Sequence, residues 1–113
     1  MRKLPEVNPY RLMWMMVFFD LPVVEEDERR ESAQFRKFLL DNGFCMVQFS
    51  VYAKICAGVE VCERYYRMIE SHLPREGAVE VLTVTDKQYS GIRSYRGEQK
   101  KSLKKQNNQL LLF

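Results

Sequence analysis

The hydrophobic pattern along the first half of the chain predicts a strand followed by a helix. Residues 12–19 are apolar without a break and end at Asp20. A run of this length and composition predicts a strand, and because both of its faces are apolar, both must be covered. Residues 26–42 have an acidic start and apolar side chains at helical spacing, and Gly43 is a strong stop signal, so they predict a helix.

The second half of the chain predicts more strand and a second helix. Residues 44–56 alternate between apolar and polar side chains, as in one long strand or in two strands with a sharp bend near residues 52–54. Apolar residues then recur at helical spacing up to Pro74, which stops the second helix. Residues 78–86 are rich in Val and Thr and predict another strand.

This order of elements predicts an α+β fold, a ferredoxin-like βαββαβ sandwich. Both helices of that architecture cover the same face of the sheet, yet residues 12–19 are apolar on both sides. A second copy of the same sheet is the simplest cover, so we expect a homodimer. Residues 87–97 alternate loosely and predict an extra C-terminal edge strand. The domain would then span residues 1–97, with a tail at 98–113.

Charge is divided unevenly between the body and the tail. Residues 1–86 carry a net charge of −3, whereas residues 87–113 carry +6. A basic tail indicates a polyanion as partner, and a solvated, poorly ordered tail is the alternative. The candidate nucleic-acid-binding residues are Arg93, Arg96, Lys100, Lys101, Lys104 and Lys105. The apolar chain end suits a protein groove, and its candidate partner-binding residues are Leu110, Leu111, Leu112 and Phe113.

Asp20 is the candidate catalytic and metal-binding residue. It follows directly after the rigid apolar run, and Mg²⁺ is commonly held by one or two carboxylates together with waters and phosphate oxygens. One carboxylate per subunit is too few, but two copies facing each other across a dimer axis would suffice. The alternative is a structural role, in which Asp20 only starts a turn at the strand end.

Cysteine content and hydropathy argue against a zinc-binding, a membrane-spanning or a secreted protein. Cys45, Cys56 and Cys62 lack C-x-x-C spacing and the chain has a single histidine, so a zinc site is not expected. All three are expected to be small buried residues in a reducing cytosol. The apolar run is far shorter than the about 20 residues that span a bilayer, and no small-residue cleavage site follows it. We therefore expect a cytoplasmic protein with no membrane partner.

Four segments carry a resemblance to a known family. FFDLP, FRKFLLDNGF, VQFSVYAK and VLTVTDKQYSGI occur in this order within residues 11–97 and resemble the CRISPR-associated protein two family, most closely its members from type II systems. The resemblance implies a ferredoxin-like homodimer with a Mg²⁺-dependent endonuclease activity, in which Asp20 binds the metal at the dimer interface. Mn²⁺ is the expected substitute ion. It also implies that the dimer bridges two copies of the CRISPR integrase and carries double-stranded spacer DNA.

Three functions remain open from the sequence. The first is a metal-dependent nuclease acting on DNA or RNA through paired copies of Asp20. The second is a DNA-binding adaptor in spacer integration, for which Asp20 is only structural. The third is a related ferredoxin-like toxin ribonuclease. In the first two, residues 110–113 are expected to dock on the integrase while the lysines before them flank bound DNA.

Overall fold

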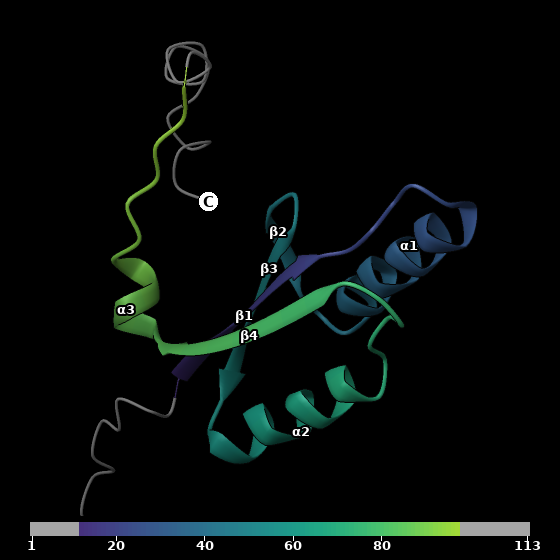
Figure 1. Ribbon diagram of the computed structural model, residues 1–113. Coiled ribbons are helices and arrows are strands. Elements are labelled where there is room, and N and C mark those ends of the chain that lie inside the picture. The colour runs from purple at the N-terminus through teal and green to yellow at the C-terminus, as the bar shows by residue number, and fades with distance from the viewer. Residues whose placement is uncertain (1–11, 98–113) are drawn as a thin grey trace, which may run out of the picture.

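The computed structural model describes residues 12–97, which form one antiparallel sheet and three helices (Figure 1). In chain order the elements are β1 (Leu12–Asp20), α1 (Glu26–Asp41), β2 (Cys45–Gln48), β3 (Val51–Ala57), α2 (Val59–Glu70), β4 (Ala78–Thr85) and α3 (Asp86–Ser90). The strand order is β2-β3-β1-β4, and every neighbouring pair is antiparallel. The predicted α+β class is confirmed, and the topology is compatible with the ferredoxin-like fold.

A side-chain cap stabilises the first turn of α1. At the start of α1, the Glu28 carboxylate accepts hydrogen bonds from the backbone N–H groups of Val24 at 3.0 Å and Glu25 at 2.9 Å. These donors have no partner within the helix, so the bonds stabilise its first turn.

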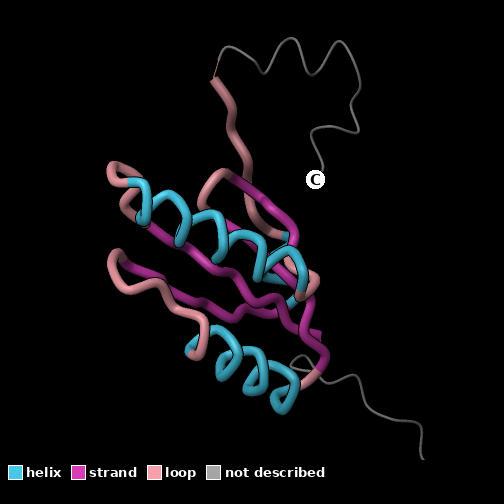
Figure 2. The backbone as a smooth tube through the Cα atoms, turned by 90° about the vertical axis from the view of Figure 1, so that its right-hand side faces the viewer, coloured by secondary structure: helices cyan, strands magenta, loops and turns pink. Residues whose placement is uncertain are grey.

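The two longer helices, α1 and α2, run along the strands (Figure 2). No helix in the described part of the chain has the length and apolarity to span a bilayer.

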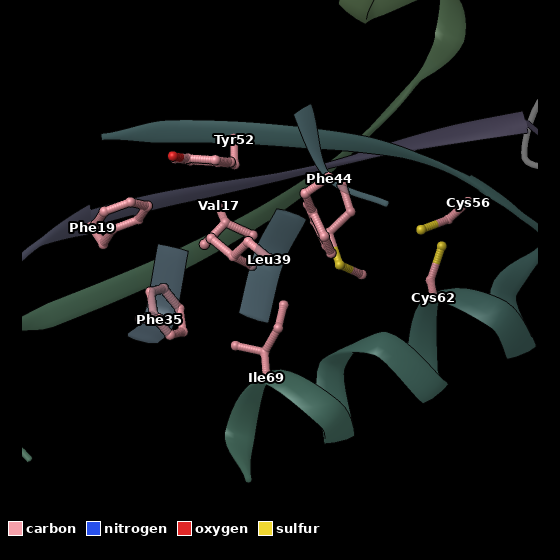
Figure 3. Packing of buried hydrophobic residues seen from close by; sticks show 10 residues of the cluster. Val17, Phe19, Phe35, Leu39, Phe44, Tyr52, Cys56, Cys62 and Ile69 are labelled. Atoms are coloured by element: carbon pink, nitrogen blue, oxygen red, sulfur yellow. The ribbon is translucent and has the colours of Figure 1, made fainter. Parts of the chain in front are cut away.

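The core lies between the sheet and these two helices. Met15, Val17 and Phe19 project from β1 toward the helices, because alternate residues of a strand share a face, and all three are buried. They pack with residues of α1 and α2 such as Leu39 and Ile69, which lie close to Val17 in Figure 3. The odd-numbered residues of β1 thus account for its burial on one side.

The other face of the sheet is only partly covered. Near the start of β1, the indole Nε1 of Trp14 donates to Asp86 Oδ1 at 2.7 Å, and its ring stacks on Tyr89 at 3.9 Å between centroids. α3 therefore covers one end of this face. Ile55, the partner of Trp14 on β3, is nonetheless 44% exposed, and Leu82, the partner of Met16 on β4, is 52% exposed. We call this whole side of the sheet, which carries the even-numbered residues of β1 and β4, the open face.

The prediction for residues 44–56 needs a correction. The chain does turn within this segment, but at Phe49 and Ser50, not near residues 52–54, which lie inside β3. Gln48 pairs with Val51, so two residues form the turn, and the pairing of β2 with β3 is irregular between Met46 and Gln48. The two turn residues are not Asn-Gly, Asp-Gly or Gly-Gly, so the usual sequence signal for a two-residue hairpin is missing.

The predicted C-terminal edge strand is wrong for the described residues. After β4 the chain forms α3 instead, and residues 91–97 contain no strand. Thr85 Oγ1 accepts from the Gln88 N–H at 3.1 Å, and Gln88 Oε1 accepts from the Thr85 N–H at 2.9 Å. This reciprocal pair is a capping box, and it starts a helix at Asp86, which we had placed in the strand.

We predict that Trp14→Phe lowers the free energy of unfolding by about 1–2 kcal/mol, because the Asp86 carboxylate loses its indole donor while an aromatic ring remains on Tyr89. Urea unfolding at fixed protein concentration measures the change. Asp86→Ala and the double variant complete a cycle whose coupling term isolates the hydrogen bond. Strictly additive effects of the two substitutions would contradict the assignment.

Candidate active site

Asp20 ends β1, and its backbone is fixed from both sides. In the sheet it pairs with Ala78 of β4. On the other side, the Phe19 N–H donates to the Ser50 carbonyl at 3.1 Å, which ties the end of β1 to the turn between β2 and β3. The Asp20 side chain is nonetheless exposed. The arrangement therefore presents an accessible carboxylate on a rigid backbone.

Gly77 packs against the backbone of Asp20. Its φ is +96°, a conformation that side-chain-bearing residues rarely adopt. A Cβ at this position would lie 2.6 Å from the Asp20 carbonyl oxygen and 2.9 Å from Leu21 Cδ2. The loop before β4 can therefore approach Asp20 this closely only because residue 77 is glycine.

The same loop is fastened to α1 by an ion-pair network. The backbone N–H of Arg75 donates to Glu31 Oε1 at 3.0 Å, and its Nε donates to Glu31 Oε2 at 2.7 Å. Arg75 Nη2 also lies 3.3 Å from Asp27 Oδ2. The backbone N–H and the guanidinium of Arg75 together lower the pKa of Glu31, and Glu31 in turn raises the pKa of Arg75. Glu31 is therefore held in its charged form.

Asp20 lines a shallow hollow of about 240 Å³ at the end of the sheet, together with Phe18, Phe19, Ser50, Val51, Ala78 and Glu80. Glu80 is a second carboxylate that sequence reasoning missed. It pairs with Phe18 and lies two residues along β4 from the partner of Asp20, so both carboxylates belong to the open face. The signal was present in the sequence, because Glu80 is the one charged residue in the alternation of positions 78, 80, 82 and 84.

The residues around the hollow fit a hard divalent cation. Its potential ligands are carboxylate oxygens, with no histidine or cysteine among the lining residues, and this donor set suits Mg²⁺ or Mn²⁺. Within residues 12–97 no group of three or more Asp, Glu, His or Cys side chains is placed to hold a metal. Asp20 and Glu80 would therefore need waters, substrate oxygens or a second chain to complete a coordination shell.

The structure does not bring the predicted nucleic-acid-binding residues to this hollow. Arg93 and Arg96 are exposed and follow α3, which contacts Trp14 near the opposite end of β1 from Asp20. The other candidates lie outside the described residues: Lys100, Lys101, Lys104, Lys105, Leu110, Leu111, Leu112 and Phe113. Their roles stay predictions.

Cys56 does not supply a nucleophile. Cys56 and Cys62 are buried with their sulfur atoms facing each other, as Figure 3 shows. Burial and the neighbouring Cys62 thiol raise the pKa of Cys56 to about 12, so this thiol stays protonated. Cys45 is exposed, which corrects the prediction that all three are buried. It lies on β2, the short strand at the sheet edge.

Comparison with known proteins identifies the family. The model for "CRISPR associated protein Cas2" matches residues 13–92. The chain belongs to the Cas2 family. A relative from Flavobacterium psychrophilum, named "CRISPR-associated endoribonuclease Cas2", is 41% identical over 95% of this chain and 93% of its own length. Cas2 proteins with the same name from Paracidovorax avenae (43% identical, over 92% of this chain and 96% of the relative) and Treponema denticola (44%, over 78% and 87%) are similar. The resemblance inferred from the sequence motifs is thereby confirmed.

We predict that Gly77→Ala lowers the free energy of unfolding by more than backbone strain alone would, which costs about 1–3 kcal/mol. The additional loss arises because the new methyl group also displaces the Asp20 carbonyl. Gly58→Ala is the matched control, since Gly58 has a similar φ of +99° but no atom within 4 Å of the added Cβ. Urea unfolding compares the two variants, and the amide chemical shift of Asp20 reports the displacement. Equal losses of stability with an unchanged Asp20 shift would contradict the contact.

Proposed function

We propose that this chain is a Mg²⁺-dependent endoribonuclease of a CRISPR system, with Asp20 as its catalytic metal-binding residue. The observation that carries the proposal is the exposed Asp20 carboxylate on a backbone held by β4, Gly77 and Ser50. The names of the relatives make RNA the substrate to test first. Membership of the Cas2 family favours a CRISPR role over the toxin ribonuclease.

The residues of the hollow suggest how the chemistry is divided. Asp20 and Glu80 would hold the metal ion through their carboxylate oxygens. A divalent ion held by these carboxylates would supply Lewis-acid stabilisation of the phosphate and would lower the pKa of the attacking water. The rigid end of β1 keeps Asp20 in place, so little reorganisation is needed when substrate binds.

The open face supports a homodimer as the active form. Leu82 and Ile55 expose apolar side chains there, and α3 covers only the end near Trp14. A second copy packed on this face would remove apolar surface from water, which is favourable. Because Asp20 and Glu80 belong to the same face, such a dimer can pool the carboxylates of two chains at a shared site.

A second role, as an adaptor, is supported by membership of the Cas2 family. This role does not require a metal site. In this role the dimer bridges two copies of the CRISPR integrase and carries double-stranded spacer DNA. Arg93, Arg96 and the lysines of residues 100–105 would contact phosphates, and residues 110–113 would dock on the integrase. The two roles are compatible in one protein.

We predict that Asp20→Asn abolishes Mg²⁺-dependent cleavage of RNA without loss of folding, because the amide cannot replace the charged carboxylate at the metal. Cleavage of single-stranded and duplex RNA and DNA is measured across a Mg²⁺ titration, with circular dichroism as the check on folding. Asp41→Asn is the control, since Asp41 pairs with Lys37 at the end of α1 and should leave cleavage intact.

The same variant separates the two roles. Undiminished cleavage by well-folded Asp20→Asn would overturn the nuclease assignment. Acquisition of new spacers in cells that carry the variant, the integrase and a CRISPR array would show that the adaptor role does not need the Asp20 carboxylate.

We predict that Leu82→Asp converts the dimer to a monomer, because a buried, unpaired carboxylate at the interface costs several kcal/mol. Light scattering at micromolar concentration measures the molar mass. Leu40→Asp is the matched control: Leu40 is 53% exposed on α1, close to the 52% of Leu82, but lies away from the open face. A wild-type protein that is already monomeric would remove the argument for a shared metal site.

A further inference from the structure

Phe49 is an exposed aromatic residue at the turn between β2 and β3. Its side chain is 74% exposed, although the alternation of the sequence had placed it on the apolar face of the segment. Turns usually carry small polar residues, and folding gains little from a ring left in water. A single exposed apolar side chain is common and does not by itself indicate a function. The Phe49 ring differs from such a side chain in its contacts with a cation.

Arg36 of α1 holds the turn and the Phe49 ring. Its Nη1 donates to the Phe49 carbonyl at 2.7 Å, and its Cζ lies 4.2 Å from the centre of the Phe49 ring. The same guanidinium is 5.2 Å from the ring of Phe19. No carboxylate within residues 12–97 forms an ion pair with Arg36, so its charge remains available to an anion.

This pair adjoins the Asp20 hollow through two backbone connections. Phe49 immediately precedes Ser50, which lines the hollow, and the Ser50 carbonyl accepts the Phe19 N–H next to Asp20. An exposed ring, a stacked cation and a candidate metal-binding carboxylate therefore share one end of the sheet. The turn lies where the two faces of the sheet meet, with Arg36 on the side of α1 and the Asp20 carboxylate on the open face.

We propose that Phe49 and Arg36 form a stacking platform for one unpaired base of the nucleic acid next to the phosphate at Asp20. The proposal rests on the proposed ribonuclease function and names the substrate class as single-stranded RNA. The base stacks on the open side of the Phe49 ring, and Arg36 attracts the adjacent phosphate. Because every base has a π-face, the platform accepts all four bases, whereas bases within a duplex are already stacked and cannot insert.

The platform is tested by binding, without cleavage, in the Asp20→Asn background and in the presence of EDTA. The probe is a single-stranded RNA oligonucleotide with 2-aminopurine at one position, whose fluorescence falls when the base stacks on an aromatic ring. We expect Phe49→Ala to weaken binding by about tenfold and to abolish the quenching, and Phe49→Trp to restore both. Affinity for duplex RNA should not change. Val59→Ala is the control, because Val59 is 65% exposed and follows the opposite end of β3.

Arg36→Lys separates charge from planarity. Lysine keeps the positive charge but loses the flat guanidinium that lies over Phe49, so we expect weaker quenching with a nearly unchanged salt dependence of binding. Quenching equal to that of the parent protein would count against the paired platform.

The outcomes distinguish this proposal from the proposed function. Unchanged affinity and quenching in Phe49→Ala would overturn the platform even where Asp20→Asn abolishes cleavage. Conversely, a platform detected by binding stands if the protein proves to cleave nothing. An equal loss for single strands and duplexes would also overturn it. So would a loss that merely follows dissociation of the dimer, since the ring would then pack on a second copy of the chain.

Discussion

The central position of β1 is the constraint on which the other elements depend. Hydrogen-bonded on one side to β3 and on the other to β4, it cannot shift its register without breaking two ladders. Its odd-numbered residues fill the core under α1 and α2, and its even-numbered residues form the middle of the open face. The strand is thus fixed both along its length and in its rotation. The backbone of Asp20, at the end of this strand, is therefore held in a fixed position.

Much of this arrangement could be predicted, because it depends on patterns local to the sequence. An uninterrupted apolar run, helical spacing between acidic starts and stop residues, and a Val- and Thr-rich strand are signals that each element carries by itself. The candidate carboxylate Asp20 was predictable for the same reason, since it ends a run that has to be buried. Its neighbours were harder to predict because they come from other elements.

The errors arose where tertiary contacts or short side-chain motifs outweighed the local pattern. The hairpin turn contains Phe49 and is held by a cation from α1, which no spacing rule reveals. The reciprocal bonds of Thr85 and Gln88 start a helix, although the loose alternation of apolar and polar residues after them predicts a strand. Glu80 came to adjoin Asp20 only through the pairing of β1 with β4, so knowledge of the strand order was needed to find it. Once that order is known, a lone charge on an otherwise apolar face becomes informative.

The bonds of Glu31 with Arg75 give the outer surface of α1 an influence on the site. Glu31 and Asp27 look like solvent-exposed acids of a helix's first turns, whose replacement would ordinarily be tolerated. Yet the loop they anchor carries Gly77, which rests against the carbonyl of Asp20. Replacing either acid would loosen the loop that holds the Asp20 backbone, although neither acid touches Asp20 itself. A search for functional positions limited to the hollow would overlook both.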